Sequence, residues 1–122
     1  MTIESQVLKC ISDEKCRGIL SIIKENRPLL PNDLNLTHKQ YYSRLHCLLV
    51  CGLIRKTAGQ YRLSSFGRIV YDWHLVMRDT ISNEYWKLKA LDMIGSAGIP
   101  EPEREKVLNS LIGNERLRKF LE

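Results

Sequence analysis

The fold of this chain is decided by residues 37–63, which read THKQYYSRLHCLLVCGLIRKTAGQYRL. The first half places apolar side chains at helical spacing and ends at Gly52, and glycine commonly follows the last residue of a helix. The second half gives two short β-strand patterns separated by Ala58 and Gly59. We therefore predict a helix over residues 37–51, with Thr37 as its N-cap, followed by a β-hairpin.

Each of these elements carries a finer expectation. One stripe of the helix is assigned to the core and consists of Tyr41, Leu45, Leu48 and Leu49. The strands are expected at residues 53–57 and 60–63. Because alanine is unfavourable at the positive φ that a two-residue hairpin loop requires, we expect a somewhat longer loop.

Helices are predicted on both sides of this stretch. Residues 12–26 begin with Ser-Asp-Glu, a capping residue with an acidic first turn, and stop before Pro28. A short leading helix is expected within residues 1–11, and a short turn near residues 31–34. After the hairpin, Ser64 or Ser65 caps a helix that we expect to break or restart at residues 82–83, with further helices over 84–94, 103–112 and 115–121. The apolar face assigned to the helix after the hairpin consists of Phe66, Ile69, Val70, Trp73, Val76, Met77 and Ile81.

The order helix, turn, helix, hairpin, long helix is that of a winged helix-turn-helix domain. We predict a mainly α fold with a small β-hairpin, divided into a winged-helix domain over residues 1–80 and a C-terminal helical extension over residues 81–122. The helix at 37–51 would be the recognition helix, and the hairpin at 54–63 would be the wing.

Composition limits the class of protein. The chain has 122 residues, 43% of them apolar and 27% charged, which is typical of one globular domain. No apolar run approaches the ~20 residues of a membrane helix, and no secretory signal is visible, so we expect a cytoplasmic protein. The four cysteines form no C-x-x-C pair and are expected to be free thiols.

The positive charge is concentrated in the first half of the chain. Residues 1–63 hold ten lysines and arginines against five acids, a net charge of +5, whereas residues 64–122 hold nine of each. Between Asp33 and Asp72 there are six lysines and arginines and no acid. A local field of one sign favours a polyanionic partner.

Three segments carry a family resemblance: LNLTHKQYYSRLHCLLVCGLIRK, GQYRLSSFGRIVYD and YWKLKALD. They resemble archaeal winged-helix transcriptional regulators, over roughly residues 12–94 and most closely over 36–72. The resemblance implies DNA binding in transcription regulation, usually as a homodimer. The chain departs from that family at His38, where a basic residue is frequent, and at Cys47 and Cys51, which leaves ligand sensing open.

The expected DNA contacts follow from the helix face and the hairpin. Lys39 suits guanine acceptors, Gln40 suits adenine through a bidentate pair, and Ser43 suits either base or phosphate. Backbone N–H groups after Thr37 are suited to hold a phosphate. The predicted DNA-binding residues are Thr37, His38, Lys39, Gln40, Tyr42, Ser43, Arg44, His46, Arg55, Lys56, Gln60 and Arg62.

The segment 84–94 is apolar on more than one side, so it requires cover on more than one side. We predict a homodimer, and the residues assigned to its interface are Tyr71, Leu75, Tyr85, Trp86, Leu88 and Met93.

Metal binding and catalysis are indicated less strongly by the sequence. Cys47 and Cys51 are four residues apart and would share a helix face, where they could bind a soft metal with His46, although a structural role as small apolar residues is favoured. No catalytic motif and no cofactor site is predicted.

The alternative function is a winged-helix adaptor within a larger transcription or chromatin assembly. RNA binding is a third possibility, which is disfavoured by the small number of aromatic residues expected on the surface.

Overall fold

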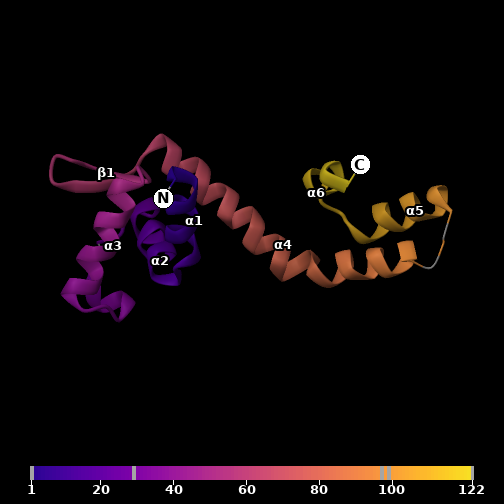
Figure 1. The fold of residues 1–122 in the computed structure, drawn as a ribbon, viewed down its shortest axis with the longest axis horizontal. Helices are drawn as coiled ribbons and strands as arrows, with labels where there is room; N and C mark the ends of the chain where they lie inside the picture. Colours follow the sequence, from indigo (N-terminus) through magenta and orange to yellow (C-terminus); the bar gives the residue numbers. More distant parts are fainter. Residues whose placement is uncertain (1, 29, 97, 99, 122) are drawn as a thin grey trace. The chain divides into compact units, whose positions relative to one another are not determined.

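The computed structural model describes residues 2–28, 30–96, 98 and 100–121, and its elements are shown in Figure 1. It is mainly helical with one antiparallel hairpin. The chain divides into two compact units, Met1–His74 and Leu75–Glu122. In chain order the elements are α1 (Ile3–Ser12), α2 (Glu14–Lys24), the 3₁₀ turn η1 (Pro31–Leu34), α3 (His38–Val50), β1 (Ile54–Thr57), β2 (Gln60–Leu63), α4 (Ser65–Ser96), α5 (Glu101–Leu111) and α6 (Glu115–Leu121).

The core of the first unit lies around α2, which contacts α1, α3 and β2. Figure 1 shows these helices gathered together, with the hairpin following the end of α3. Burial of large aliphatic side chains is the main force that holds them, because each removes apolar surface from water. The largest fully buried side chains of this unit are Ile19, Leu20, Leu45, Leu48 and Leu53.

The helix boundaries of the first unit follow the local signals. Asp13 caps α2 by accepting hydrogen bonds from the backbone N–H groups of Lys15 and Cys16. Thr37 caps α3, as the sequence predicts, by accepting from the N–H of Gln40 at 3.2 Å. Gly52 follows α3 with a φ of 77°, a backbone conformation in which glycine carries no steric penalty.

The hairpin loop is shorter than expected. Thr57 pairs with Gln60, so the loop consists of Ala58 and Gly59 alone, with φ values of 51° and 78°. The expectation of a longer loop was wrong, because strand pairing holds Ala58 in the left-handed region in spite of its unfavourable Cβ contacts.

The start of α4 is fixed against the end of α3. The Ser64 hydroxyl oxygen accepts from the N–H of Gly67 and donates to backbone carbonyls of Gly52 and Leu53. Gly67 lies so close to Leu53 that a Cβ built on it would approach the Leu53 carbonyl oxygen to 1.9 Å. The close approach of these two backbones therefore requires glycine at this position.

α4 is one continuous helix of 32 residues, so the expected break at residues 82–83 is wrong. Ser and Asn are only moderately unfavourable inside a helix, and neither supplies a break as strong as proline. Thr80 satisfies its hydroxyl by donating to the Val76 carbonyl at 2.7 Å, one turn back. The division between the two compact units falls within α4, between His74 and Leu75.

In the second unit, α5 lies alongside the C-terminal part of α4 (Figure 1). Among its described residues only Leu91 and Ile112 are fully buried apolar side chains. Several large apolar side chains remain exposed, including Met77, Ile81, Trp86 and Phe120. None of the helices in the described residues has the length and apolar character needed to span a bilayer.

Candidate nucleic-acid interface

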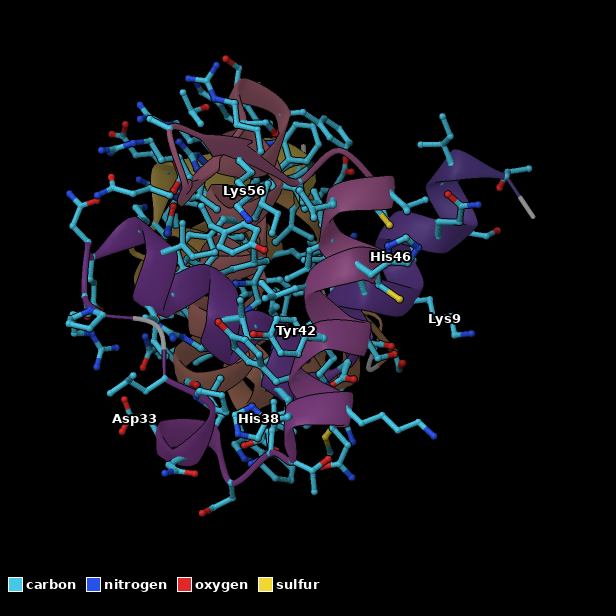
Figure 2. All side chains as sticks on the ribbon, turned by 90° about the vertical axis from the view of Figure 1, so that its left-hand side faces the viewer. Lys9, Asp33, His38, Tyr42, His46 and Lys56 are labelled. Atoms are coloured by element: carbon cyan, nitrogen blue, oxygen red, sulfur yellow. The ribbon has the colours of Figure 1, made fainter. Side chains whose placement is uncertain are left out.

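α3 turns one face to the core and the other to solvent. Tyr41, Leu45 and Leu48 are buried, whereas the opposite face of the helix is exposed over its whole length. Figure 2 looks onto this exposed face, with Tyr42 and His46 on α3 and Lys56 on the hairpin. The exposed surface of α3 with β1 and β2 is called the α3–hairpin face below. The exposed α3 side chains on it are His38, Lys39, Gln40, Tyr42, Ser43, His46, Cys47 and Val50.

The electrostatics of the α3–hairpin face are those of uncompensated cations. Within the described residues, Lys39, Arg55, Lys56 and Arg62 make no ion pair with an acid. Lys56 instead lies over the ring of Tyr61, its partner on the opposite strand, with its Nζ 5.3 Å from the ring centroid. A face with free cations and no compensating acid attracts polyanions over distances of about a Debye length.

The two hairpin arginines have polar or charged neighbours on the strands. The Arg62 guanidinium donates to the Gln60 side-chain oxygen at 3.0 Å along the outer surface of β2. Arg55 stands opposite Arg62 in the antiparallel register, so two like charges lie on neighbouring strands. Like charges in a cross-strand pair are destabilising, which indicates a requirement other than stability at these positions.

Arg44 is engaged in an ion pair within the first unit. Its Nε donates to Asp13 Oδ2 at 3.1 Å, and its Nη1 donates to the carbonyl of Gln40. Both partners of the Arg44–Asp13 ion pair are partly buried. This side chain therefore joins α3 to the N-terminus of α2, and its expected contact with DNA stays a prediction.

The side chain of Gln40 is also engaged within the protein. Its Oε1 accepts from the backbone N–H of Thr37 at 3.0 Å, which completes a reciprocal capping box. A bidentate contact with adenine needs both amide atoms, so it would require this cap to open. Gln40 thus has a structural role in this structure, for which the spacing Thr-x-x-Gln was the sequence signal, and its contact with a base stays a prediction.

The first turn of α3 keeps unpaired backbone donors. The N–H groups of His38 and Lys39 have no intrahelical acceptor, because the first turn of any helix leaves its donors free. His38 is exposed beside them (Figure 2). This end of α3 is suited to an anion, since the helix dipole adds to the effect of the free donors.

Lys9 was not among the residues chosen from the sequence. It is exposed in the last turn of α1, and Figure 2 shows it beside α3 on the side of His46. It therefore extends the positive surface beyond α3. Nothing local in the sequence indicates this, because the approach of α1 to α3 is a tertiary contact.

The predicted interface residues of the C-terminal half divide by exposure. Tyr85, Trp86 and Met93 are exposed, Leu75 and Leu88 are half-buried, and Tyr71 is only 6% exposed. Tyr71 packs within the first unit, under the Lys24 ammonium, 4.8 Å from its ring centroid. The assignment of Tyr71 to a dimer interface is therefore corrected. Phe66, Ile69 and Trp73, which belong to the apolar face predicted for the helix after the hairpin, are exposed.

Titration of the buried groups contributes nothing to the charge of this face near neutral pH. Burial raises the pKa of the Tyr41 hydroxyl, and the neighbouring Tyr61 and Tyr42 raise it further. Burial also raises the pKa of the Cys16 thiol to about 11, with a further contribution from Asp13. Both groups therefore remain neutral.

No group of three or more histidine, cysteine or acidic side chains in the described part of the chain is arranged to hold a metal ion. Comparison of the whole sequence and structure with family models, with curated proteins and with solved structures gives no match.

Proposed function

We propose that this protein binds double-stranded DNA sequence-specifically and regulates transcription, with the first unit acting as a winged helix-turn-helix domain. The observation that carries the proposal is the α3–hairpin face, where Lys39, Arg55, Lys56 and Arg62 stand exposed without acidic partners. The element order of helix, turn, helix and hairpin supports it, because this is the order of winged-helix domains.

In the proposed mechanism the two kinds of contact are separate. The hairpin cations and the free N–H groups at the start of α3 bind phosphates and set the register of the protein on the duplex. The exposed face of α3 enters the major groove, where Lys39, Ser43 and His46 meet base edges. Val50 at the end of this face offers an apolar contact of the kind that thymine methyl groups accept.

The proposal includes a homodimer formed through the second unit. The exposed Trp86 and Met93 support it, since apolar side chains of this size gain most from being covered by a partner. A dimer would present two recognition helices to two half-sites, as symmetric DNA-binding proteins do.

The test is a titration of the full chain with random and genomic duplex fragments at several salt concentrations. A preferred fragment should bind more tightly than random duplex by at least ~10³-fold, with an affinity that falls steeply with salt. Arg55→Ala should reduce the salt slope by about one ion and weaken all duplexes alike. Equal affinity for every duplex would overturn the claim of sequence specificity.

A second candidate is a winged-helix adaptor in a transcription or chromatin assembly. The exposed apolar side chains Phe66, Ile69 and Trp73 at the start of α4 favour it, because they suit a protein partner. A salt-independent lack of DNA binding, together with capture of a defined transcription-machinery subunit that is lost in Trp73→Ala, would favour the adaptor.

A further inference from the structure

All four cysteines of the chain line one pocket in the first unit. The pocket has a volume of about 480 Å³ and lies between α1 and α3, with Cys10 from α1, Cys16 from α2, and Cys47 and Cys51 from the end of α3. Cys47 is exposed, and the other three are buried at the base. Thiols distant in sequence are thus brought together beside a space that a small molecule can enter.

Two of these thiols are already in contact. The Sγ atoms of Cys10 and Cys51 are 3.2 Å apart, although the residues are 41 positions apart in the chain. A disulfide requires about 2.05 Å, so the sulfurs have to approach by roughly 1 Å.

We propose that Cys10 and Cys51 are a redox-modification site, oxidised to an intramolecular disulfide by low-molecular-weight disulfides that enter the pocket between α1 and α3. In the first step the Cys51 thiolate attacks one sulfur of the small disulfide, forming a mixed disulfide and releasing one small thiolate. In the second step the Cys10 sulfur attacks Cys51 Sγ, forming the Cys10–Cys51 bond and releasing the second small thiolate. The two cysteine protons pass to the two leaving groups, so one small disulfide yields two small thiols.

The surroundings of Cys10 fit the order of these steps. Burial and, after it, the contact with Cys51 together raise the pKa of the Cys10 thiol to about 12. Cys10 therefore holds its proton until the mixed disulfide is beside it, and it reacts second because the attack is then intramolecular.

The bond would join α1 to the residue that directly follows α3. It would close a loop that contains α2, η1 and α3, so the unfolded chain would lose much of its conformational freedom. Oxidation would thus stabilise the whole first unit. This inference stands independently of the proposed DNA binding, because it rests only on the thiol geometry.

The test uses the full chain incubated with oxidised glutathione and then alkylated under denaturing conditions. The expected product has two free thiols in place of four, no bound glutathione, and one cross-linked peptide pair that contains Cys10 and Cys51. Its thermal midpoint should rise by about 10 °C and return when dithiothreitol is added.

The variants separate this pair from the other thiols. Cys47→Ser and Cys16→Ser should keep both the cross-link and the rise in midpoint, whereas Cys10→Ser and Cys10→Ala should lose both. A peptide map of the parent protein decides the matter even if a Cys10 variant does not fold. A link through Cys47, or glutathione adducts alone, would overturn the proposal.

Discussion

The two compact units of this protein differ in charge and in burial. The first unit, residues 1–74, carries a net charge of +5 and a set of fully buried aliphatic side chains. The second unit, residues 75–122, has equal numbers of basic and acidic residues, and several of its largest apolar side chains are exposed. A basic surface favours a polyanionic partner and exposed apolar side chains favour a protein partner, which supports the proposed division between DNA binding and dimerisation.

The largest expected effect tests the close packing of the first unit. Gly67→Ala should lower its free energy of unfolding by about 3 kcal/mol or more, because the new Cβ would overlap the Leu53 carbonyl oxygen and force α4 away from the hairpin. Thermal or urea unfolding followed by circular dichroism measures this change.

Gly113→Ala in the second unit is the matched control. A Cβ at Gly113 meets nothing within 4 Å, so the free energy of unfolding should change by no more than about 0.5 kcal/mol. If the two substitutions lowered the free energy of unfolding equally, the first unit would not be more tightly packed at Gly67 than the second unit is at Gly113.

The next largest effect concerns self-association. Trp86→Ala should weaken the proposed dimer by about 2 kcal/mol or more, since a large exposed aromatic is the kind of residue that dominates such interfaces. Sedimentation equilibrium over a range of protein concentrations measures the dissociation constant.

Trp73→Ala provides the comparison for that experiment, because Trp73 is 67% exposed on the same helix but belongs to the first unit. It should leave the dimer largely intact. If Trp73→Ala dissociated the dimer and Trp86→Ala did not, the dimer interface would lie in the first unit and not in the second.

The charge difference between the units is tested by removing one lysine from each. Lys39→Ala should weaken specific duplex binding by about 1–3 kcal/mol, because Lys39 is exposed and without an acidic partner on the α3–hairpin face. Lys106→Ala in the second unit removes the same charge and should leave binding unchanged. Fluorescence anisotropy at fixed salt measures both, and equal losses would show that only total charge matters.

The smallest expected effect is a gain in stability in the first unit. Ala58→Asn should raise the free energy of unfolding by about 1 kcal/mol, since Asn tolerates the positive φ of this position and Asn-Gly is the preferred two-residue hairpin loop. Gly59→Ala should act in the opposite direction, because Gly59 has a φ of 78°. Urea denaturation resolves the sign of each change.

The sequence predicted the features that depend on neighbouring residues. The cap at Thr37 and the stop at Gly52 are local, so the bounds of α3 could be predicted closely, whereas α2 is capped by Asp13 and not by Ser12, which ends α1. The two strands were predictable from their local pattern, whereas the length of their loop was not, because strand pairing overcame the preference of Ala58.

The features missed from the sequence depend on contacts between distant segments. The ion pair of Arg44 was missed, because its partner Asp13 is 31 residues away. The apolar spacing of Phe66, Ile69 and Trp73 predicted a helix, but these side chains are exposed, since periodicity does not say what covers a face. Lys9 joined the basic surface only through the packing of α1 near α3.

The contacts of Asp13 affect how sequence variants of this protein should be interpreted. One of its carboxylate oxygens caps α2 and the other accepts from Arg44 of α3, so a single side chain joins the start of one helix to the body of the next. Under the proposed function, we expect a substitution at Asp13 to alter ligand binding through the placement of α3. A survey limited to the exposed residues of α3 and the hairpin would overlook such a variant.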